Sequence, residues 1–448
     1  MSTPHAPAPP DRPRSEVTDA RRAAAEVCAD LRRGELLDAA FDARAAHLDA
    51  RDRRWLQELV YGMLRRRAAL DARLAPRVTG GLGRLDPDVV DLLRLGADQL
   101  LFMGSVPAYA AIAQTVELVK TRHGLGASRL ANAVLRRLDR EREAAPETPA
   151  DPVEALALRH SHPRWLVARW VARWGAEETE RLLAANDAEP PIVLRPAGTT
   201  SAALAAMLAE AGLATRPAAL LADSLEVAAG PSLVDTGAYR QGRFFVQDPA
   251  ATLVARYAAV PAGARVADLC AAPGGKALEL ARDAALVVAA DRSALRMPRL
   301  VRNLARVGAA NVFPVIADAR FPAVREMDAV LLDAPCSGTG TFRRHPDARW
   351  RLKPSDLAVM GALQRALLRA AAAAVRPGGL LIYSTCSLET EENDAQVESF
   401  LADRADFTLE PPPEGSVPAA VLDAGRLRVL PQRHGADGAF AARLRRAA

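Results

Sequence analysis

Two cysteines and one aspartate stand out in this chain because each follows a short run of apolar residues. Asp333 ends the run 330–332, Cys336 lies in the glycine-containing loop that follows, and Cys386 comes after the run 380–382. An ionised thiol is a strong nucleophile, and a carboxyl group can exchange protons with a substrate. The structural alternative is a strand-ending turn with a buried cysteine, since free cysteine often packs as a small hydrophobic residue. The choice depends on whether the fold brings the three side chains together.

The elements that would position these residues alternate between strand and helix from residue 265 onward. Such alternation predicts a parallel sheet with helices on both faces. Because open sheets of this kind reverse their strand order beside the first strand, the first, fourth and fifth strands should be neighbours. Their carboxyl ends would bring Asp333, Cys336 and Cys386 together, with Cys270 at the same edge. The strands are expected at 265–270, 285–291, 311–318, 328–335 and 377–387, and helices at 293–308 and 355–375.

The ends of the first four strands carry groups that suit a nucleoside ligand. The segment DLCAAPGGK (268–276) is neither a dinucleotide fingerprint nor a P-loop, and its two glycines open a helix and allow close backbone approach. Asp291 is placed to accept hydrogen bonds from ribose hydroxyls, and Asp318 to meet an adenine amino group. Each acid alone could simply cap a helix. Together with Asp333 they indicate a nucleoside that lacks a pyrophosphate, such as S-adenosylmethionine.

Two thiols, an acid and a methyl donor fit methylation of carbon 5 of cytosine. That carbon is not nucleophilic enough to take a methyl group directly, whereas a thiolate that adds to carbon 6 gives it enamine character. An acid at ring N3 favours the addition, and a second group assists loss of the C5 proton and release of the enzyme. The residues alone do not order the two thiols. A metal site is another use of cysteines, but no C-x-x-C or suitably spaced histidine pair supports it.

Composition places the chain among helix-rich globular proteins of the cytoplasm. Its 448 residues predict two or three domains, and its 59 Lys and Arg against 54 Asp and Glu give a net charge of +5, which only weakly indicates nucleic acid. Four cysteines make no disulfide framework, which points to a reducing compartment. The sequence contains no long uncharged apolar stretch, so we expect no membrane span. We expect a cytoplasmic monomer that needs neither a metal nor a membrane.

Five regions follow from the spacing of helices, linkers and strands. We expect a disordered lead-in (1–15), a helical bundle (16–142), a Pro-rich linker (143–152), a helical and small α+β subdomain (153–245) and a catalytic α/β domain (246–448).

Two kinds of residue in the first half of the chain could contact RNA. Arginine clusters at 65–67 and 136–137 could bind RNA phosphates, although such clusters are more often solvated helix faces. Three tryptophans in the helical segment 161–186 could stack on bases, but their spacing favours packing in a core.

Several motifs resemble those of a known family, the RNA (cytosine-C5) methyltransferases. The matching segments are DLCAAPGGK, DAPCSGTGTFRRHPDARW, YSTCSLETEEN and FVQDPAATLVA. The N-terminal bundle, through LVYGMLRR, LRLGADQLLFM, VPAYAAIAQTVELVK and NAVLRRL, resembles the antitermination factor NusB. This pairing is similar to the bacterial RsmB/Sun/Fmu type, which methylates a cytosine of 16S ribosomal RNA. The segment 434–446 departs from the family in having Ala439 before Phe440, which puts packing or RNA contact there in doubt.

The resemblance implies a fold, a cofactor, a partner and a role for each site residue. It implies a NusB-like bundle followed by a Rossmann-like methyltransferase domain, with 16S rRNA or a small-subunit assembly intermediate as partner. Cys386 would be the nucleophile and Cys336 the releasing thiol, while Asp333 would face both base and cofactor. The implied S-adenosylmethionine site consists of Cys270, Ala271, Ala272, Pro273, Gly274, Gly275, Lys276, Asp291, Asp318 and Asp333.

Three other functions stay open at this point. The substrate could be another RNA such as tRNA, the methyl group could go to an exocyclic amine, or the protein could be a non-catalytic assembly factor that binds RNA.

Overall fold

The chain divides into two compact units in the computed structural model, which describes residues 17–144, 148–228 and 232–448. The first unit extends to Leu183 and also includes the short segment His345–Trp350. The second unit contains the remaining residues, 184–344 and 351–448. Within the described ranges, no helix is long and apolar enough to cross a membrane.

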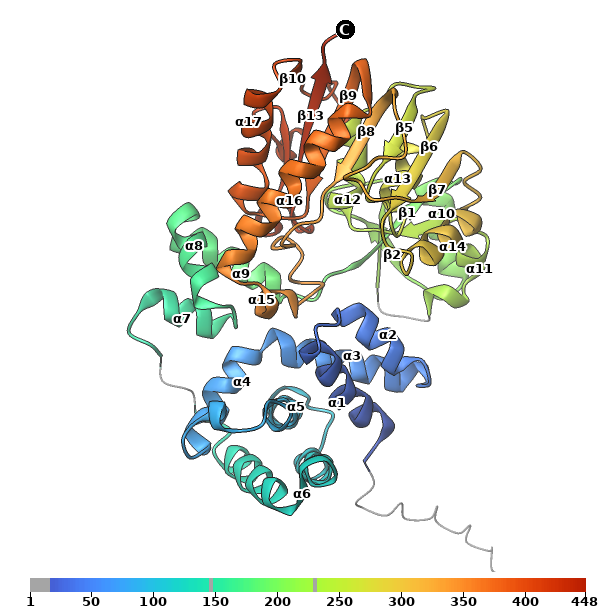
Figure 1. Ribbon diagram of the computed structural model, residues 1–448. Coiled ribbons are helices and arrows are strands. Elements are labelled where there is room, and N and C mark those ends of the chain that lie inside the picture. Colours follow the sequence, from blue (N-terminus) through green and yellow to red (C-terminus); the bar gives the residue numbers. More distant parts are fainter. Residues whose placement is uncertain (1–16, 145–147, 229–231) are drawn as a thin grey trace, which may run out of the picture. The chain divides into compact units, whose positions relative to one another are not determined.

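The first unit is built from amphipathic helices (Figure 1). Asp49 caps α3 by accepting the backbone N–H groups of Arg51 and Asp52, and Asp86 caps α5 ahead of a proline at its first position. Buried leucine, valine and alanine side chains between Ala23 and Leu138 form one apolar core. The helices are α1 (Asp19–Arg32), α2 (Leu37–Ala45), α3 (Ala50–Arg65), α4 (Arg67–Leu74), α5 (Pro87–Phe102), α6 (Ala108–Arg140), α7 (Pro152–Arg159), α8 (Arg164–Trp174) and α9 (Ala176–Asp187), the last of which ends in the second unit.

The arginine cluster 65–67 is not a solvated face. All three side chains are half-buried, and Arg66 Nε lies 2.7 Å from the fully buried Asp98 carboxylate. The Arg67 guanidinium lies over the Trp350 ring, 5.3 Å from its centroid. Arg66 and Arg67 therefore make contacts inside the first unit. Arg136 and Arg137, by contrast, are exposed near the end of α6.

The tryptophans of the segment 161–186 are at least half-buried, in line with the predicted packing in a core. Trp170 is fully buried, whereas Trp165 and Trp174 are half-buried. The Arg173 guanidinium lies 4.5 Å from the ring centroid of Trp174.

The second unit begins with a small antiparallel sheet in the order β2-β3-β1-β4. Leu194, Leu204, Leu208 and Phe244 form its core against the helix α10. The elements are β1 (Ile192–Pro196), α10 (Ser201–Glu210), β2 (Thr215–Pro217), β3 (Leu225–Val227), α11 (Gly237–Arg240) and β4 (Phe244–Val246).

A nine-stranded mixed sheet forms the rest of this unit (Figure 1). Its order is β11-β12-β13-β9-β8-β5-β6-β7, and β10 pairs with β13. The strands are β5 (Arg265–Asp268), β6 (Leu286–Asp291), β7 (Val312–Ile316), β8 (Met327–Asp333), β9 (Val375–Thr385), β10 (Phe407–Leu409), β11 (Leu422–Asp423), β12 (Arg426–Val429) and β13 (Ala439–Arg446).

The sequence prediction of a parallel sheet is confirmed for five of these strands. The strands β9, β8, β5, β6 and β7 pair in parallel, with β9, β8 and β5 adjacent as expected. The sheet as a whole is not parallel, because β13 continues it antiparallel to β9. This strand covers most of the segment 434–446, and both Ala439 and Phe440 are buried in it.

Helices cover both faces of the large sheet. Alternate strand residues pack into two separate cores, so that Val266, Leu331 and Ile382 lie in one and Ala267, Val330 and Leu381 in the other. The first core includes side chains of α12 (Pro249–Ala258), α13 (Gly275–Leu280) and α14 (Met297–Val307), and the second those of α16 (Pro354–Ala373) and α17 (Asp394–Asp403). The central strands therefore lie between two packed layers of helices, and their carboxyl ends share one edge of the sheet.

Candidate active site

The two predicted thiols meet at the carboxyl edge of the large sheet. Cys336 lies in the loop after β8, Cys386 follows β9 directly, and their sulfur atoms are 3.3 Å apart. The parallel register of the two strands pairs Asp333 with Ser384, which brings the residues that follow each strand side by side. The structure thus puts two of the three cysteines that the sequence assigned to this edge in contact, and the third, Cys270, comes two residues after β5, the parallel neighbour of β8.

Close backbone packing fixes the loop that carries Cys336. The Gly340 N–H donates to the Cys386 carbonyl at 2.9 Å, and the Gly438 N–H donates to the Gly340 carbonyl at 2.7 Å. A Cβ atom at Gly340 would lie 2.6 Å from the Gly438 Cα and 2.7 Å from the Cys386 oxygen. Only glycine fits at this position, because any side chain would push the loop away from Cys386.

Four charged side chains, of which only Arg344 is partly exposed, hold the end of the same loop. Arg343 and Arg344 both bridge Asp248, the N-cap residue of α12, and Asp437, which precedes β13. Asp248 also accepts the Asp437 backbone N–H at 3.0 Å. This network connects the FVQDP segment, the loop after β8 and the C-terminal strand, and it explains why the three segments carry these polar residues.

Asp333 forms an ion pair beside the thiols. Its Oδ2 accepts a hydrogen bond from Lys276 Nζ at 2.7 Å, and its Oδ1 accepts one from the Ser384 hydroxyl at 2.8 Å. Burial favours the neutral amine of Lys276, but the Asp333 carboxylate outweighs it and raises the lysine pKa. Sequence reasoning missed Ser384, although strand alternation places it on the same side of β9 as Cys386.

The contact between the two sulfur atoms raises the pKa of the Cys336 thiol well above its usual value. The hydrogen bond with Cys386 is the largest cause, burial is the second, and the charges of Cys386 and Glu392 add to them. A thiolate at Cys336 would face a sulfur atom and a carboxylate, both of which disfavour negative charge. Cys336 therefore remains protonated at neutral pH as long as Cys386 is not bonded to a substrate.

The predicted cofactor loop leads from β5 into α13. Ala271 N–H donates to the Ala290 carbonyl at 2.8 Å, and Gly274 has a φ of 107°, a conformation that favours glycine. At Gly275 the structure gives a further reason for glycine, which is packing. A Cβ atom there would lie 2.7 Å from Gln247 Nε2 and 2.9 Å from the Phe245 ring, so packing requires this glycine.

The acids at the ends of β6 and after β7 differ in their surroundings. Asp291 is buried and accepts the backbone N–H groups of Ser293 at 2.9 Å and Ala272 at 3.1 Å, which ties it to the cofactor loop. Asp318 pairs with Arg320 at 2.6 Å, and hydrogen bonds from Arg320 lower the pKa of Asp318 to about 2. Asp291 is thus hydrogen-bonded to the cofactor loop, whereas Asp318 pairs with a residue of its own turn.

Comparison with known proteins places this geometry in a family. Residues 259–445 match the model of the 16S rRNA methyltransferase RsmB/F family, residues 18–140 match the NusB family, and residues 162–233 match the ferredoxin-like domain of RsmF/B-like methyltransferases. A probable ribosomal RNA small subunit methyltransferase B from Synechocystis is 36% identical across 96% of this chain and 100% of its own length. The chain belongs to the RsmB/F methyltransferase family.

Other relatives agree with this assignment. The ribosomal RNA small subunit methyltransferase B of Vibrio cholerae is 35% identical over 91% of this chain and 92% of its own. The solved structure of the protein PH0851 has a TM-score of 0.81 and 27% identity, covering 97% of this chain and 99% of that one. A methyltransferase homolog from Pyrococcus horikoshii has a TM-score of 0.57 and 28% identity over 66% of this chain and 100% of its own. The predicted NusB-like bundle and Rossmann-like domain are both confirmed.

One buried acid of this RsmB/F domain was missed by the sequence-based site. Asp268, the last residue of β5, is almost fully buried, and burial raises its pKa to about 7, with the Asp333 charge adding to the effect. Its Oδ1 accepts the Cys270 N–H at 3.3 Å, whereas its Oδ2 is a buried atom without a hydrogen-bond partner among the described residues. The first residue of the DLCAAPGGK segment was the available signal, since it ends the strand.

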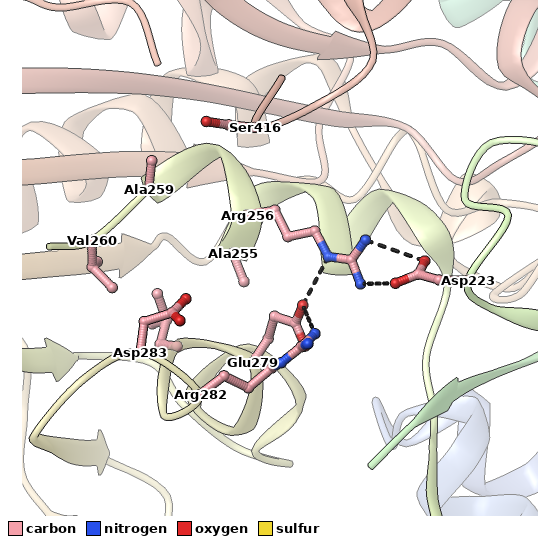
Figure 2. A pocket seen from close by; sticks show the side chains of 10 residues that line it. Asp223, Ala255, Arg256, Ala259, Val260, Glu279, Arg282, Asp283 and Ser416 are labelled. Atoms are coloured by element: carbon pink, nitrogen blue, oxygen red, sulfur yellow. Dashed lines mark hydrogen bonds and ion pairs between the residues drawn. The ribbon is translucent and has the colours of Figure 1, made fainter. Parts of the chain in front are cut away.

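A separate cavity of about 390 Å³ lies in the same unit. Figure 2 shows the residues that line it. They come from the end of α12, the end of α13 and the turn after each helix, and Asp223 and Ser416 complete the lining. None of the predicted site residues lines it, and Arg256 at its centre is bonded to Asp223 and Glu279, at 2.7 and 2.8 Å. Among the described residues, no cluster of His, Cys, Asp or Glu side chains could hold a metal ion.

Proposed function

We propose that this methyltransferase transfers the methyl group of S-adenosylmethionine to carbon 5 of a cytosine in 16S rRNA, through a covalent bond between Cys386 and the base. One observation carries the proposal: two thiols 3.3 Å apart, in the strand-end loops beside the Asp333–Lys276 ion pair. An exocyclic-amine methyltransferase needs no second thiol. The relatives named small subunit methyltransferase B support ribosomal RNA of the small subunit as the substrate.

The reaction starts with the addition of the Cys386 thiolate to carbon 6 of the ring. The electron pair that this bond displaces gives carbon 5 the reactivity to take a methyl group, which S-adenosylmethionine supplies as an electrophile. A base then removes the hydrogen on carbon 5, the ring double bond re-forms, and Cys386 leaves with the electron pair of the carbon–sulfur bond. The net result is one methyl group gained and one proton released.

The charge coupling between the sulfur atoms supports Cys336 as that base. Cys386 is the main reason that the pKa of Cys336 is raised. Once the Cys386 sulfur is bonded to carbon, it no longer shares a proton with Cys336 or repels its negative charge. Cys336 then ionises more readily, after the addition and beside the ring. The same coupling keeps it from competing as the nucleophile beforehand.

Asp333 and Lys276 support protonation of the cytosine ring. Ring N3 accepts a hydrogen bond, so a carboxyl group that stabilises the adduct there must carry a proton. Asp333 would take up that proton from solvent as the base binds, while Lys276, 2.7 Å from its Oδ2, and Ser384 hold the carboxyl group in place. The pair thereby makes carbon 6 more electrophilic as the thiolate attacks.

The acids around the loop 270–276 fit S-adenosylmethionine as the cofactor. The buried Oδ2 of Asp268, which has no hydrogen-bond partner within the described part of the chain, and the carboxylates of Asp291 and Asp318 can accept hydrogen bonds. This suits ribose hydroxyls and the amino groups of the cofactor. A positively charged sulfonium is favoured near so many acids. We therefore propose the residues at 270–276, together with Asp268, Asp291, Asp318 and Asp333, as its site.

The test is to map 5-methylcytosine in 16S rRNA from cells with and without the protein, and to follow transfer of tritium from labelled S-adenosylmethionine to RNA. A single 5-methylcytosine that disappears with the gene supports the proposal. Labelled N4-methylcytosine in the product would contradict carbon 5 as the target, label in tRNA would contradict the substrate, and no transfer to any RNA would indicate a non-catalytic assembly factor.

A further inference from the structure

A fully buried carboxylate lies behind the two thiols, and the chemistry above does not use it. Glu392, at the end of the short turn η4 (Thr390–Glu392), has no exposed side-chain surface. Its Oε1 accepts hydrogen bonds from the Ser337 backbone N–H at 2.8 Å and from Gln364 Nε2 at 3.0 Å. Its Oε2 accepts hydrogen bonds from the hydroxyls of Ser337 and Ser387.

The partners of Glu392 are the immediate neighbours of both cysteines. Ser337 follows Cys336, and Ser387 follows Cys386. One carboxylate thus binds two chain segments that come from different strands. Charge-assisted hydrogen bonds of this kind are short and directional, and in a buried site they fix the separation of the groups they join.

The residues before each cysteine are held from the same side. Gln364, on α16, donates to the Pro335 carbonyl at 2.9 Å as well as to Glu392. Asn393, next to Glu392 in the chain, accepts from the Thr385 hydroxyl at 2.5 Å and donates to the Ser387 carbonyl at 2.8 Å. Both residues that flank each cysteine are therefore hydrogen-bonded to Glu392, to its hydrogen-bond partner Gln364 or to its chain neighbour Asn393.

We propose that Glu392 is a positioning residue that holds Cys336 and Cys386 at a separation where one sulfur can act directly after the other. Its catalytic consequence rests on the proposed function, whereas its geometric consequence does not. A buried carboxylate is costly unless its hydrogen bonds are made, so the two loops are held together whenever the domain is folded. Glu392 also disfavours a thiolate at Cys336, which agrees with release that follows attack.

The first experiment measures the thiol separation without RNA or cofactor. Diamide takes two electrons and two protons from a pair of neighbouring thiols and leaves a disulfide, while it becomes the hydrazine. In the full-length protein, mass spectrometry should find a Cys336–Cys386 disulfide that forms rapidly. Glu392→Ala should slow its formation about tenfold or more, because displacements near 1 Å have effects of this order. Glu392→Gln, which keeps an acceptor and can bond both hydroxyls, should stay within about threefold of the wild type.

Two further variants make the result decisive. Ser387→Ala keeps the carboxylate but removes its hydrogen bond to the Cys386 segment, and it should slow the cross-link in the same way. Glu398→Gln, at a side chain that is 67% exposed on α17, is the matched control and should change nothing. Wild-type cross-linking rates in folded Glu392→Ala and Ser387→Ala would overturn the proposal, and Ser387→Ala alone decides if Glu392→Ala does not fold.

Kinetics separate this proposal from the proposed function. Glu392→Ala should lower kcat for methyl transfer while the Kd of S-adenosylmethionine stays unchanged, and Glu392→Gln should restore most of the rate. An unchanged kcat in folded Glu392→Ala would contradict the positioning role. If the wild type cross-links as expected but methylates no cytosine, the proposed function fails and the positioning of the thiols stands.

Discussion

At the scale of single residues, the two thiols predict opposite variant phenotypes. Cys386→Ala should bind RNA and cofactor but form no covalent adduct, because the attacking sulfur is missing. Cys336→Ala should attack and methylate, then stall before release, since the base that removes the C5 proton is gone. A denaturing gel with labelled RNA measures the difference directly, as a slowly migrating protein–RNA band that accumulates in Cys336→Ala alone.

The control for this pair is Cys28→Ala, at a buried cysteine of α1 in the other unit. It should leave both adduct and turnover at wild-type levels. A stable adduct in Cys386→Ala and none in Cys336→Ala would reverse the two roles. Full activity without adducts in both variants would contradict a covalent mechanism.

The ion pair predicts a defect in the addition step itself. Asp333→Asn cannot donate a proton to ring N3, and it should lower the rate of adduct formation by about a hundredfold or more, the size typical of a lost general acid. Single-turnover mixing of enzyme, cofactor and RNA, followed by denaturing gels, measures this rate. Wild-type adduct formation in Asp333→Asn would show that the acid serves cofactor binding instead.

How far the sequence could predict the site is clear from particular residues. Asp333, Cys336 and Cys386 could be placed together because each follows a recognisable apolar strand, and the order of parallel strands follows from topology. Ser384, Asp268 and Glu392 could not be assigned roles in this way. Their importance comes from hydrogen bonds to residues distant in sequence, such as the bond of 2.8 Å from the Ser337 N–H to Glu392, and these bonds have no periodic signal.

At the scale of elements, the apolar pattern does not reveal every interruption of a helix. Helical spacing runs from 51 to 75, but the structure has two helices there, α3 and α4, separated at Arg66, whose φ of −100° and ψ of 10° are not helical. The break in α6 has a local signal, because it lies at Gly124, where φ is 80°. Where no glycine or proline marks the turn, as at Arg66, tertiary contacts decide where the backbone turns.

The C-terminal strand was the longest strand without a sequence prediction. The segment GAFAARLRR does not show the apolar pattern of a buried strand, because Arg443 occupies a buried position. Its Nε donates to the Ala258 carbonyl at 3.0 Å. A buried arginine interrupts the hydrophobic pattern by which a strand inside a sheet is recognised. The antiparallel addition of β13 to β9 therefore follows from partners that no local window contains.

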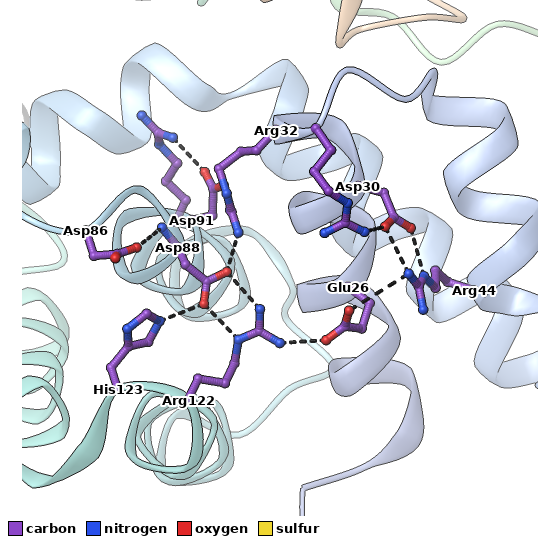
Figure 3. Close-up of polar contacts among 11 residues, drawn as sticks. Glu26, Asp30, Arg32, Arg44, Asp86, Asp88, Asp91, Arg122 and His123 are labelled. Carbon is purple, nitrogen blue, oxygen red and sulfur yellow. Dashed lines mark hydrogen bonds and ion pairs between the residues drawn. The ribbon is translucent and has the colours of Figure 1, made fainter.

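A network of charges connects three helices of the bundle (Figure 3). Asp88 on α5 accepts hydrogen bonds from Arg122 at 2.7 Å, from His123 at 2.7 Å and from Arg32 on α1. Burial alone would raise the pKa of Asp88, but the hydrogen bonds from Arg122, His123 and Arg32 outweigh it and hold the pKa at about 2. Ionised Asp88 therefore ties α1, α5 and α6 to one another.

This network predicts a pH-dependent stability. A carboxylate whose pKa is lowered by folding stabilises the folded state above its unfolded pKa, and that contribution is lost as the pH falls towards 2. Asp88→Asn should lower the free energy of unfolding by about 2 kcal/mol at pH 7, and the deficit should shrink below about pH 4. Urea unfolding across this pH range measures it. Asp42→Asn, at an exposed ion pair of α2, should change stability by less than about 0.5 kcal/mol.

At the scale of the whole molecule, the bundle predicts how RNA affinity depends on salt. Arg136 and Arg137 are exposed at the end of α6, whereas Arg66 is committed to Asp98. Replacing both exposed arginines by alanine should weaken RNA binding and lower the salt slope by about 1.5 to 2. Filter binding over a range of salt concentrations measures the slope, with equilibrium dialysis to show unchanged cofactor affinity.

The matching control is Arg369→Ala, at an exposed arginine on α16 that pairs with Asp403. An equal loss of affinity in this variant would mean that net charge, rather than the bundle, decides RNA binding. Unchanged affinity in the Arg136 and Arg137 variant would indicate that the bundle binds protein or serves as a scaffold.

The short segment His345–Trp350 has a consequence for how this protein is made. Its side chains complete the first unit: Trp350 Nε1 donates to the Leu64 carbonyl at 2.7 Å, and the fully buried Arg349 donates to the Ser161 carbonyl at 3.3 Å. During vectorial synthesis the ribosome adds these residues long after the helices that they contact. A gene cut after Leu183 would therefore encode a unit that lacks part of its own interior, including the partner of the Leu64 carbonyl.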